Sequence, residues 1–135
     1  MEEIIQKYLQ KGELKKALNL LEIYKDKESN NVALNYYFGK VYFQLNDHKK
    51  SLFYFRKCNQ INPGNPKILY NLAQVLQGQG KIDEAKKIYE KLIKENSKDI
   101  KSYYGLFNLG LKNINNDYAI KLEKLSNDKD IKLFD

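Results

Sequence analysis

Residues 32–65 have the sequence VALNYYFGKVYFQLNDHKKSLFYFRKCNQINPGN. Apolar residues recur here at helical intervals in two bursts, which are Phe38, Val41, Tyr42 and Leu45, then Leu52, Phe55, Cys58 and Ile61. Between the bursts lies Asn46, a residue type that tolerates a positive φ in tight turns. The stretch is therefore predicted to form two helices joined by a short turn.

The same pattern recurs along the chain with a period of 34 residues. The period is visible in columns of equivalent residues, namely Tyr36, Tyr70 and Tyr104; Phe38, Leu72 and Leu106; Val41, Val75 and Leu109; and Ala17, Ser51, Ala85 and Ala119. Pro66 stands where a helix should begin, after an Asn-Pro-Gly-Asn stop signal. We therefore expect four helix-turn-helix units in a single domain, at 1–31, 32–65, 66–99 and 100–135.

This pattern resembles the tetratricopeptide repeat, a helix-turn-helix unit with fixed small and large residues. The unit 32–65 carries it best, with Phe38-Gly39, Tyr42, Asn46, Ser51, Phe55 and Asn62-Pro63. The next unit, 66–99, shows the same pattern at Leu72-Ala73, Gly80, Ala85 and Tyr89. The resemblance implies an all-α, right-handed α-α superhelix of about three repeats plus a divergent C-terminal capping unit. Small residues such as Gly39 and Ala85 would let paired helices approach closely.

The end units depart from the pattern. Ile5 and Phe107 stand where small residues are expected, and the last helix slips by one residue, so that Tyr118, Leu122 and Leu125 share a face. Terminal repeats are commonly atypical because they cap the solenoid. The tail 130–135 offers three apolar side chains, so it either folds back as a cap or leads into further chain.

Composition narrows the class of protein. The chain has 135 residues, 42% of them hydrophobic and 30% charged, with one Cys and no apolar run long enough for a membrane span. The absence of a second Cys excludes an intramolecular disulfide, and the acidic start is unlike a signal peptide. We therefore expect a cytoplasmic globular protein. The net charge of +7 comes from Lys, with Arg56 the only Arg, and by itself is weak evidence for nucleic-acid binding.

Catalytic and metal-binding patterns are missing. His48 is expected to be a packed or half-exposed aromatic, and Cys58 a buried structural thiol. Gly78-Gln79-Gly80 lacks the third glycine of a dinucleotide loop, and Asp83-Glu84 suit a helix start. The sequence thus predicts no enzyme, cofactor or metal site.

In the family that the chain resembles, first helices of the units line a concave groove. This places along the groove Tyr36, Lys40, Phe43, Lys67, Tyr70, Asn71, Gln74, Gln77, Lys101, Tyr104, Asn108, Leu111 and Lys112. The first-helix segments 32–46, 66–79 and 100–113 contain no Asp or Glu, while nearly all acids fall on second helices and turns. A concave surface without acids would focus positive potential.

Two interpretations of the groove tyrosines stay open. They either pack between helices or offer rigid apolar area and hydroxyls to an extended peptide. The family's carboxylate clamp uses Lys, Asn, Asn, Lys and Arg, of which only Asn71 and Lys101 are matched; Tyr36, Lys40 and Gly105 replace the others. Binding of an acidic peptide by a looser arrangement is favoured over that clamp.

We therefore predict a non-catalytic protein-binding scaffold or adaptor, with an acidic peptide partner in its groove. One alternative is the N-terminal interaction arm of a larger enzyme, such as a sulfotransferase or glycosyltransferase. Another is a basic repeat protein that binds nucleic acid, which is the less favoured partner. The sequence does not specify the oligomeric state.

Overall fold

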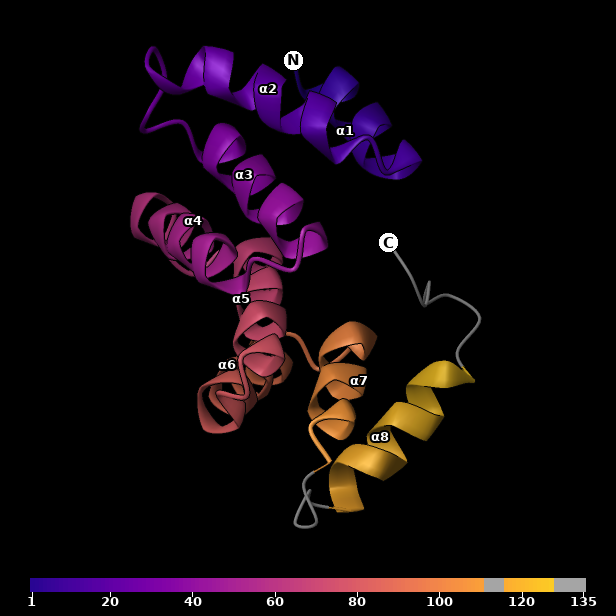
Figure 1. The fold of residues 1–135 in the computed structure, drawn as a ribbon. Coiled ribbons are helices and arrows are strands. Elements are labelled where there is room, and N and C mark those ends of the chain that lie inside the picture. The colour runs from indigo at the N-terminus through magenta and orange to yellow at the C-terminus, as the bar shows by residue number, and fades with distance from the viewer. Residues whose placement is uncertain (111–115, 128–135) are drawn as a thin grey trace.

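The computed structural model describes residues 1–110 and 116–127, which form eight helices and no strand (Figure 1). The helices are α1 (Glu2–Lys11), α2 (Leu14–Lys25), α3 (Val32–Gln44), α4 (His48–Ile61), α5 (Pro66–Gly78), α6 (Ile82–Glu95), α7 (Ile100–Asn108) and α8 (Asn116–Ser126). Each helix packs on the next along the chain, and the pairs stack in order from α1–α2 to α7–α8. The all-α architecture predicted from the sequence is confirmed.

The turns inside the first three helix pairs each have a left-handed residue, as the sequence predicted for Asn46. Gly12, Asn46 and Gly80 have φ of 72°, 63° and 76°. Between pairs, Asn65 caps α5, because its side-chain oxygen accepts hydrogen bonds from the backbone N–H groups of Lys67 and Ile68. Pro66 occupies the first turn of α5, where a missing N–H has no cost.

Close approach within the α3–α4 pair depends on Gly39. A Cβ at this position would lie 2.7 Å from the ring of Phe55, a buried residue of α4. Beside it, the Ser51 hydroxyl donates a 2.7 Å hydrogen bond to the Gly39 carbonyl oxygen. The small residue on α3 therefore makes room for a ring on α4, as the repeat pattern predicted.

The buried residues form two clusters that meet at α4. One cluster joins α1 to α4 and includes Tyr54, whose ring stacks on Phe38 at 4.6 Å between centroids. The other joins α4 to α7 and includes Leu52 and Phe55. Helix α4 therefore buries residues on two sides and holds the two clusters together.

The last pair differs from the others as the sequence indicated. Tyr118, Leu122 and Leu125 of α8 pack against the second cluster, so the predicted slip of one residue is confirmed. Ala119 is exposed and does not occupy the buried position of Ala85, so its place in that column was wrong. Helix α7 ends at Asn108, earlier than the predicted segment 100–113, since Gly110 adopts a φ of 67°. Leu111, Lys112 and the predicted cap at 130–135 lie outside the described residues.

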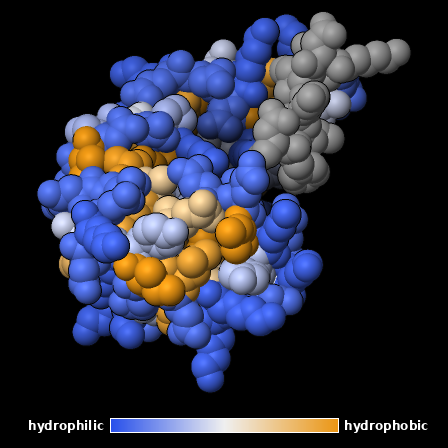
Figure 2. Space-filling view, turned by 90° about the horizontal axis from the view of Figure 1, so that it is seen from above, coloured by the Kyte–Doolittle hydropathy of each residue, from blue (hydrophilic) through white to orange (hydrophobic). Residues whose placement is uncertain are grey.

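Figure 2 views the molecule with the α1–α2 end nearest the reader and shows apolar residues gathered inside a largely hydrophilic rim. Two large apolar side chains on these helices are exposed, Ile4 on α1 at 47% and Ile23 on α2 at 69%. No helix in the described ranges has the length and hydrophobicity that crossing a bilayer requires.

Ala85 provides a test of this packing, because it is completely buried where α6 meets its neighbours. Ala85→Leu should overpack the core and lower the free energy of unfolding by about 1–3 kcal/mol, measured by urea denaturation. The matched control is Ala119→Leu at an exposed position of α8, which should change the free energy of unfolding by less than about 0.5 kcal/mol. Equal effects of the two substitutions would contradict the packing described above.

Candidate functional site

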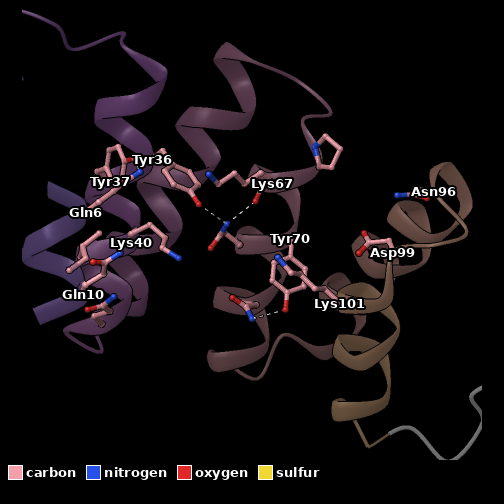
Figure 3. A pocket seen from close by; sticks show the side chains of 15 residues that line it. Gln6, Gln10, Tyr36, Tyr37, Lys40, Lys67, Tyr70, Asn96, Asp99 and Lys101 are labelled. Atoms are coloured by element: carbon pink, nitrogen blue, oxygen red, sulfur yellow. Dashed lines mark hydrogen bonds between the residues drawn. The ribbon is translucent and has the colours of Figure 1, made fainter. Parts of the chain in front are cut away.

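A cavity of about 790 Å³ opens along the first helices of the pairs. Its walls come from α1, α3 and α5, and from the start of α7 (Figure 3). It is lined by Gln6, Leu9, Gln10, Tyr36, Tyr37, Lys40, Gln44, Pro66, Lys67, Tyr70, Asn71, Gln74, Asn96, Asp99 and Lys101. We call this surface the groove. All of its helical residues lie on first helices, as the sequence predicted.

Asn71 lines the groove and is 8% exposed. Its Nδ2 donates to the hydroxyl oxygen of Tyr36 at 3.2 Å and to the carbonyl oxygen of Lys67 at 2.8 Å. The Lys67 ammonium lies 5.1 Å from the centroid of the Tyr36 ring, a cation–π contact between α5 and α3. Asn71 therefore fixes the positions of Tyr36 and of the backbone beside Lys67.

Three lysines from three helices point into the groove. Lys40 of α3, Lys67 of α5 and Lys101 of α7 surround the space in front of Asn71 (Figure 3). Burial lowers the pKa of Lys40 below its ordinary value, and the positive charges of Lys67 and Lys101 lower it further. Within the described residues, no carboxylate lies within ion-pair distance of the Lys40 ammonium.

The groove also holds one carboxylate that the sequence analysis did not place there. Asp99 precedes α7 and lines the groove. Its oxygens accept hydrogen bonds from the backbone N–H of Ser102 at 3.3 Å and from its hydroxyl at 2.7 Å. Helices α3, α5 and α7 contain no Asp or Glu, but the cap of α7 brings one carboxylate to the groove edge, because a helix N-terminus favours Asp.

Tyr36 and Tyr70 combine the two roles considered for the tyrosines, which are packing between helices and presenting a hydroxyl to a ligand. The rings of Tyr36 and Tyr70 are half-buried, in edge-on contacts with Phe55 at 5.7 Å and with Tyr89 at 6.0 Å. Their hydroxyls still reach the groove, where that of Tyr70 accepts a hydrogen bond from Gln74 Nε2 at 3.1 Å. Burial raises the pKa of both phenols, so the two hydroxyls stay protonated. Tyr36 and Tyr70 thus pack with their rings and present their hydroxyls.

Four of the predicted groove residues do not line the groove. One is Gln77, whose Oε1 accepts a hydrogen bond from the Tyr89 hydroxyl at 3.2 Å. Phe43 is half-buried, with its ring 5.7 Å from that of His48 and packed on the core. Tyr104 is 40% exposed and Asn108 is exposed, but both lie on α7 beyond the groove. Seven of the predicted groove residues are brought together, which are Tyr36, Lys40, Lys67, Tyr70, Asn71, Gln74 and Lys101.

The sequence analysis missed the contribution of α1 and three glutamines, Gln6, Gln10 and Gln44. Gln6 donates to the hydroxyl oxygen of Tyr37 at 2.9 Å, and Gln10 and Gln44 extend the wall. The period of 34 could have found them, since Gln6 aligns with Lys40 and Gln10 with Gln44. Asn96 and Asp99 belong to a connection between pairs and have no such signal.

His48 and Cys58 lie where the sequence predicted. His48 is half-buried against Phe43 and the backbone of Gly78. Cys58 is buried, its thiol donates to the Val32 carbonyl oxygen at 3.6 Å, and burial raises its pKa to about 12. Across the described residues, His, Cys, Asp and Glu do not gather into a metal-binding group.

A sequence profile of the tetratricopeptide repeat family matches residues 42–107. This match begins at the end of α3, runs through α4, α5 and α6 into α7, and includes the left-handed turn residues Asn46 and Gly80. The chain is a tetratricopeptide repeat protein.

Solved structures of the same fold superpose on this repeat protein. The crystal structure of MamA matches with a TM-score of 0.78 at 19% identity, covering 92% of this chain and 70% of that chain. The first tetratricopeptide repeat domain of Spaghetti (RPAP3), bound to the HSP90 peptide SRMEEVD, gives 0.73 at 19% identity, covering 81% and 86%. The NMR structure of the first such domain of human RPAP3 gives 0.70 at 18%, covering 93% and 92%. These identities show a shared fold. No curated protein sequence matches the chain significantly.

The charge cluster in the groove yields a stability prediction. Because burial and repulsion disfavour the charged form of Lys40 in the folded state, Lys40→Met should raise the free energy of unfolding at neutral pH. The gain in the free energy of unfolding should be complete at pH values below the folded-state pKa of Lys40. It should fade as the pH rises from that pKa to above 10.5, because Lys40 of the wild type is then neutral in the folded and unfolded states. Urea denaturation of both proteins across this range measures the difference.

The control for this prediction is Lys87→Met, at an exposed position on α6. It removes the same charge and should leave the stability nearly unchanged. A Lys40→Met gain that did not depend on pH would come from the apolar side chain and would refute the electrostatic explanation.

Proposed function

We propose that the groove binds an extended acidic segment of a protein partner, and that the chain acts as a binding module without catalysis. The observation that carries this proposal is the convergence of Lys40, Lys67 and Lys101 on one partly buried space. An anionic ligand would relieve the mutual repulsion of the three ammonium groups. Electrostatic attraction between an ammonium group and a ligand carboxylate is stronger in a concave, partly water-excluded site than on an open surface.

The single carboxylate in the groove does not cancel this charge. Asp99 is already hydrogen-bonded to Ser102, and it lies at the edge formed by the start of α7. Among the described residues that line the groove, three are Lys and one is Asp, so their formal charges sum to a positive value. We expect side-chain carboxylates of the ligand to lie near Lys40 and Lys67, away from Asp99.

The polar side chains of the groove suit a peptide backbone. Gln10, Gln44 and Gln74 each combine an amide donor with a carbonyl acceptor, and the Tyr36 and Tyr70 hydroxyls add two more groups. An extended peptide exposes N–H and C=O groups that must find partners when it leaves water. The half-buried tyrosine rings add rigid apolar area beside them.

A structural neighbour supports this choice of ligand. The first tetratricopeptide repeat domain of Spaghetti (RPAP3) has been solved with the HSP90 peptide SRMEEVD, whose letters include two Glu and one Asp. That domain shares the fold of this chain. The clamp residues matched here are only Asn71 and Lys101, and Asn71 is occupied with Tyr36 and Lys67. We therefore expect side-chain carboxylates, more than a terminal one, to drive binding.

The test is a titration of peptide SRMEEVD by fluorescence anisotropy at low and high salt. Replacing its three acidic residues with amides should weaken binding by about tenfold or more, and affinity should fall as salt rises, because the charges are screened. Amidating its C-terminus should have a smaller effect. Double reversal Lys67→Glu with Lys101→Glu should abolish binding, and Tyr70→Ala should weaken it at every salt concentration.

The control for the reversal is Lys87→Glu with Lys91→Glu, at two exposed positions of α6. It changes the net charge by the same amount outside the groove. Equal loss in the two double variants would mean that net charge alone drives binding, and the groove would have to be abandoned as the site. Binding of single-stranded DNA with the same dependence on Lys67 and Lys101 would assign the groove to nucleic acid.

A further inference from the structure

Helix α4 has a third face that neither cluster nor groove uses. This face carries residues at spacings of three and four, which are Lys49, Phe53, Arg56, Lys57 and Gln60. Leu52 forms its floor. Together these six residues line a shallow hollow of about 540 Å³, which shares no residue with the groove. We call this surface the α4 patch.

Phe53 is the main apolar feature of the α4 patch. It is 61% exposed, and its ring lies edge-on to that of Tyr54 at 5.2 Å between centroids. Neighbouring Leu52 is 6% exposed and belongs to the core below. An exposed aromatic side chain beside a hollow is an anchor that protein interfaces commonly bury.

The charge of α4 is unlike that of the other second helices. It contains four basic residues and no Asp or Glu, whereas α6 contains Asp83, Glu84, Glu90 and Glu95. The sequence analysis, which assigned the acids to second helices in general, did not separate α4 from them. The cationic surface of this protein therefore has a second centre outside the groove.

Within the described residues, the cations of the α4 patch are largely uncompensated. Lys49 and Lys57 have no carboxylate within ion-pair distance. Arg56 pairs with Glu84 of α6 at 3.4 Å, but both side chains are about half exposed, so the pair contributes little to stability. A partner carboxylate could therefore bind Lys49 and Lys57 without breaking a strong interaction.

We propose that the α4 patch is a second binding site, which takes a short acidic segment of a protein partner that carries a large apolar side chain. The apolar side chain would lie against Phe53, over Leu52 and the aliphatic stems of the lysines. Glu or Asp residues one helical turn to either side would pair with Lys49 and Lys57. The lone aromatic anchor and the hollow favour this partner over a membrane, which binds broad apolar faces, or nucleic acid, which needs no hollow.

The probe is an amidated Glu-rich peptide of about 12 residues with Leu at helical spacing, titrated against the whole chain. Phe53→Ala should weaken its binding by about tenfold or more, as should Lys49→Glu with Lys57→Glu. The control Lys87→Glu with Lys91→Glu should stay within about twofold, since exposed charges away from a site add little. Lys49, Phe53, Lys87 and Lys91 are exposed and Lys57 is half-buried. The variants should therefore fold, which circular dichroism checks.

Independence from the groove is tested in the same titration. Lys67→Glu with Lys101→Glu should leave the affinity for the Leu-containing probe within about twofold, even if that variant or the wild type fails to bind SRMEEVD. A version of the probe with Ser in place of Leu should bind at least about tenfold more weakly, because the apolar anchor is lost.

Four results would overturn the proposal. They are no saturable binding of the probe, equal loss in the Lys87 and Lys91 control, tighter binding of single-stranded DNA or anionic vesicles that also requires Phe53, and self-association lost in Phe53→Ala. The last, measured by analytical ultracentrifugation, would identify a second copy of this chain as the occupant.

Discussion

Contact between the ring of Phe55 and the backbone of Gly39 sets the distance between α3 and α4, and much of the molecule follows from it. A Cβ at Gly39 would come within 2.7 Å of that ring. Lys40 follows Gly39 on α3, and a helix turns about 100° per residue. Because Gly39 faces α4, Lys40 is directed toward the groove. The same helix pair positions Tyr36, whose ring touches Phe55 and whose hydroxyl accepts from Asn71.

The groove combines rigid packing with a local electrostatic cost. Asn71 ties α5 to α3 through Tyr36, and the Lys67 ammonium lies over the same ring. Lys40 is held near two like charges in partial burial, a condition that folding alone would not favour. Sites that bind ligands commonly retain such unfavourable groups, because the ligand provides the compensating interaction.

Helix α4 occupies the middle of the described structure and determines what its outer face can do. Tyr54 belongs to the cluster with α1–α3, while Leu52 and Phe55 belong to the cluster with α5–α7. With two sides buried in this way, Lys49, Phe53 and Lys57 cannot turn inward. Their exposure is thus a consequence of the two clusters, which makes α4 both the structural centre and the most basic of the second helices.

The sequence by itself determined the helix pairs and their turns, since a 34-residue period with Gly39, Asn46 and Pro66 leaves few alternatives. Its resemblance to the tetratricopeptide repeat implied that first helices line the groove. The sequence also found the slip of α8, because apolar spacing reports which face is buried. Tertiary structure alone decided that Asp99 enters the groove, that Tyr104 and Asn108 do not, and that Phe53 stands beside a hollow. The reason is that periodicity gives the face of a helix on which a residue lies, whereas the curvature of the stack, and the caps and connections between pairs, decide which faces converge.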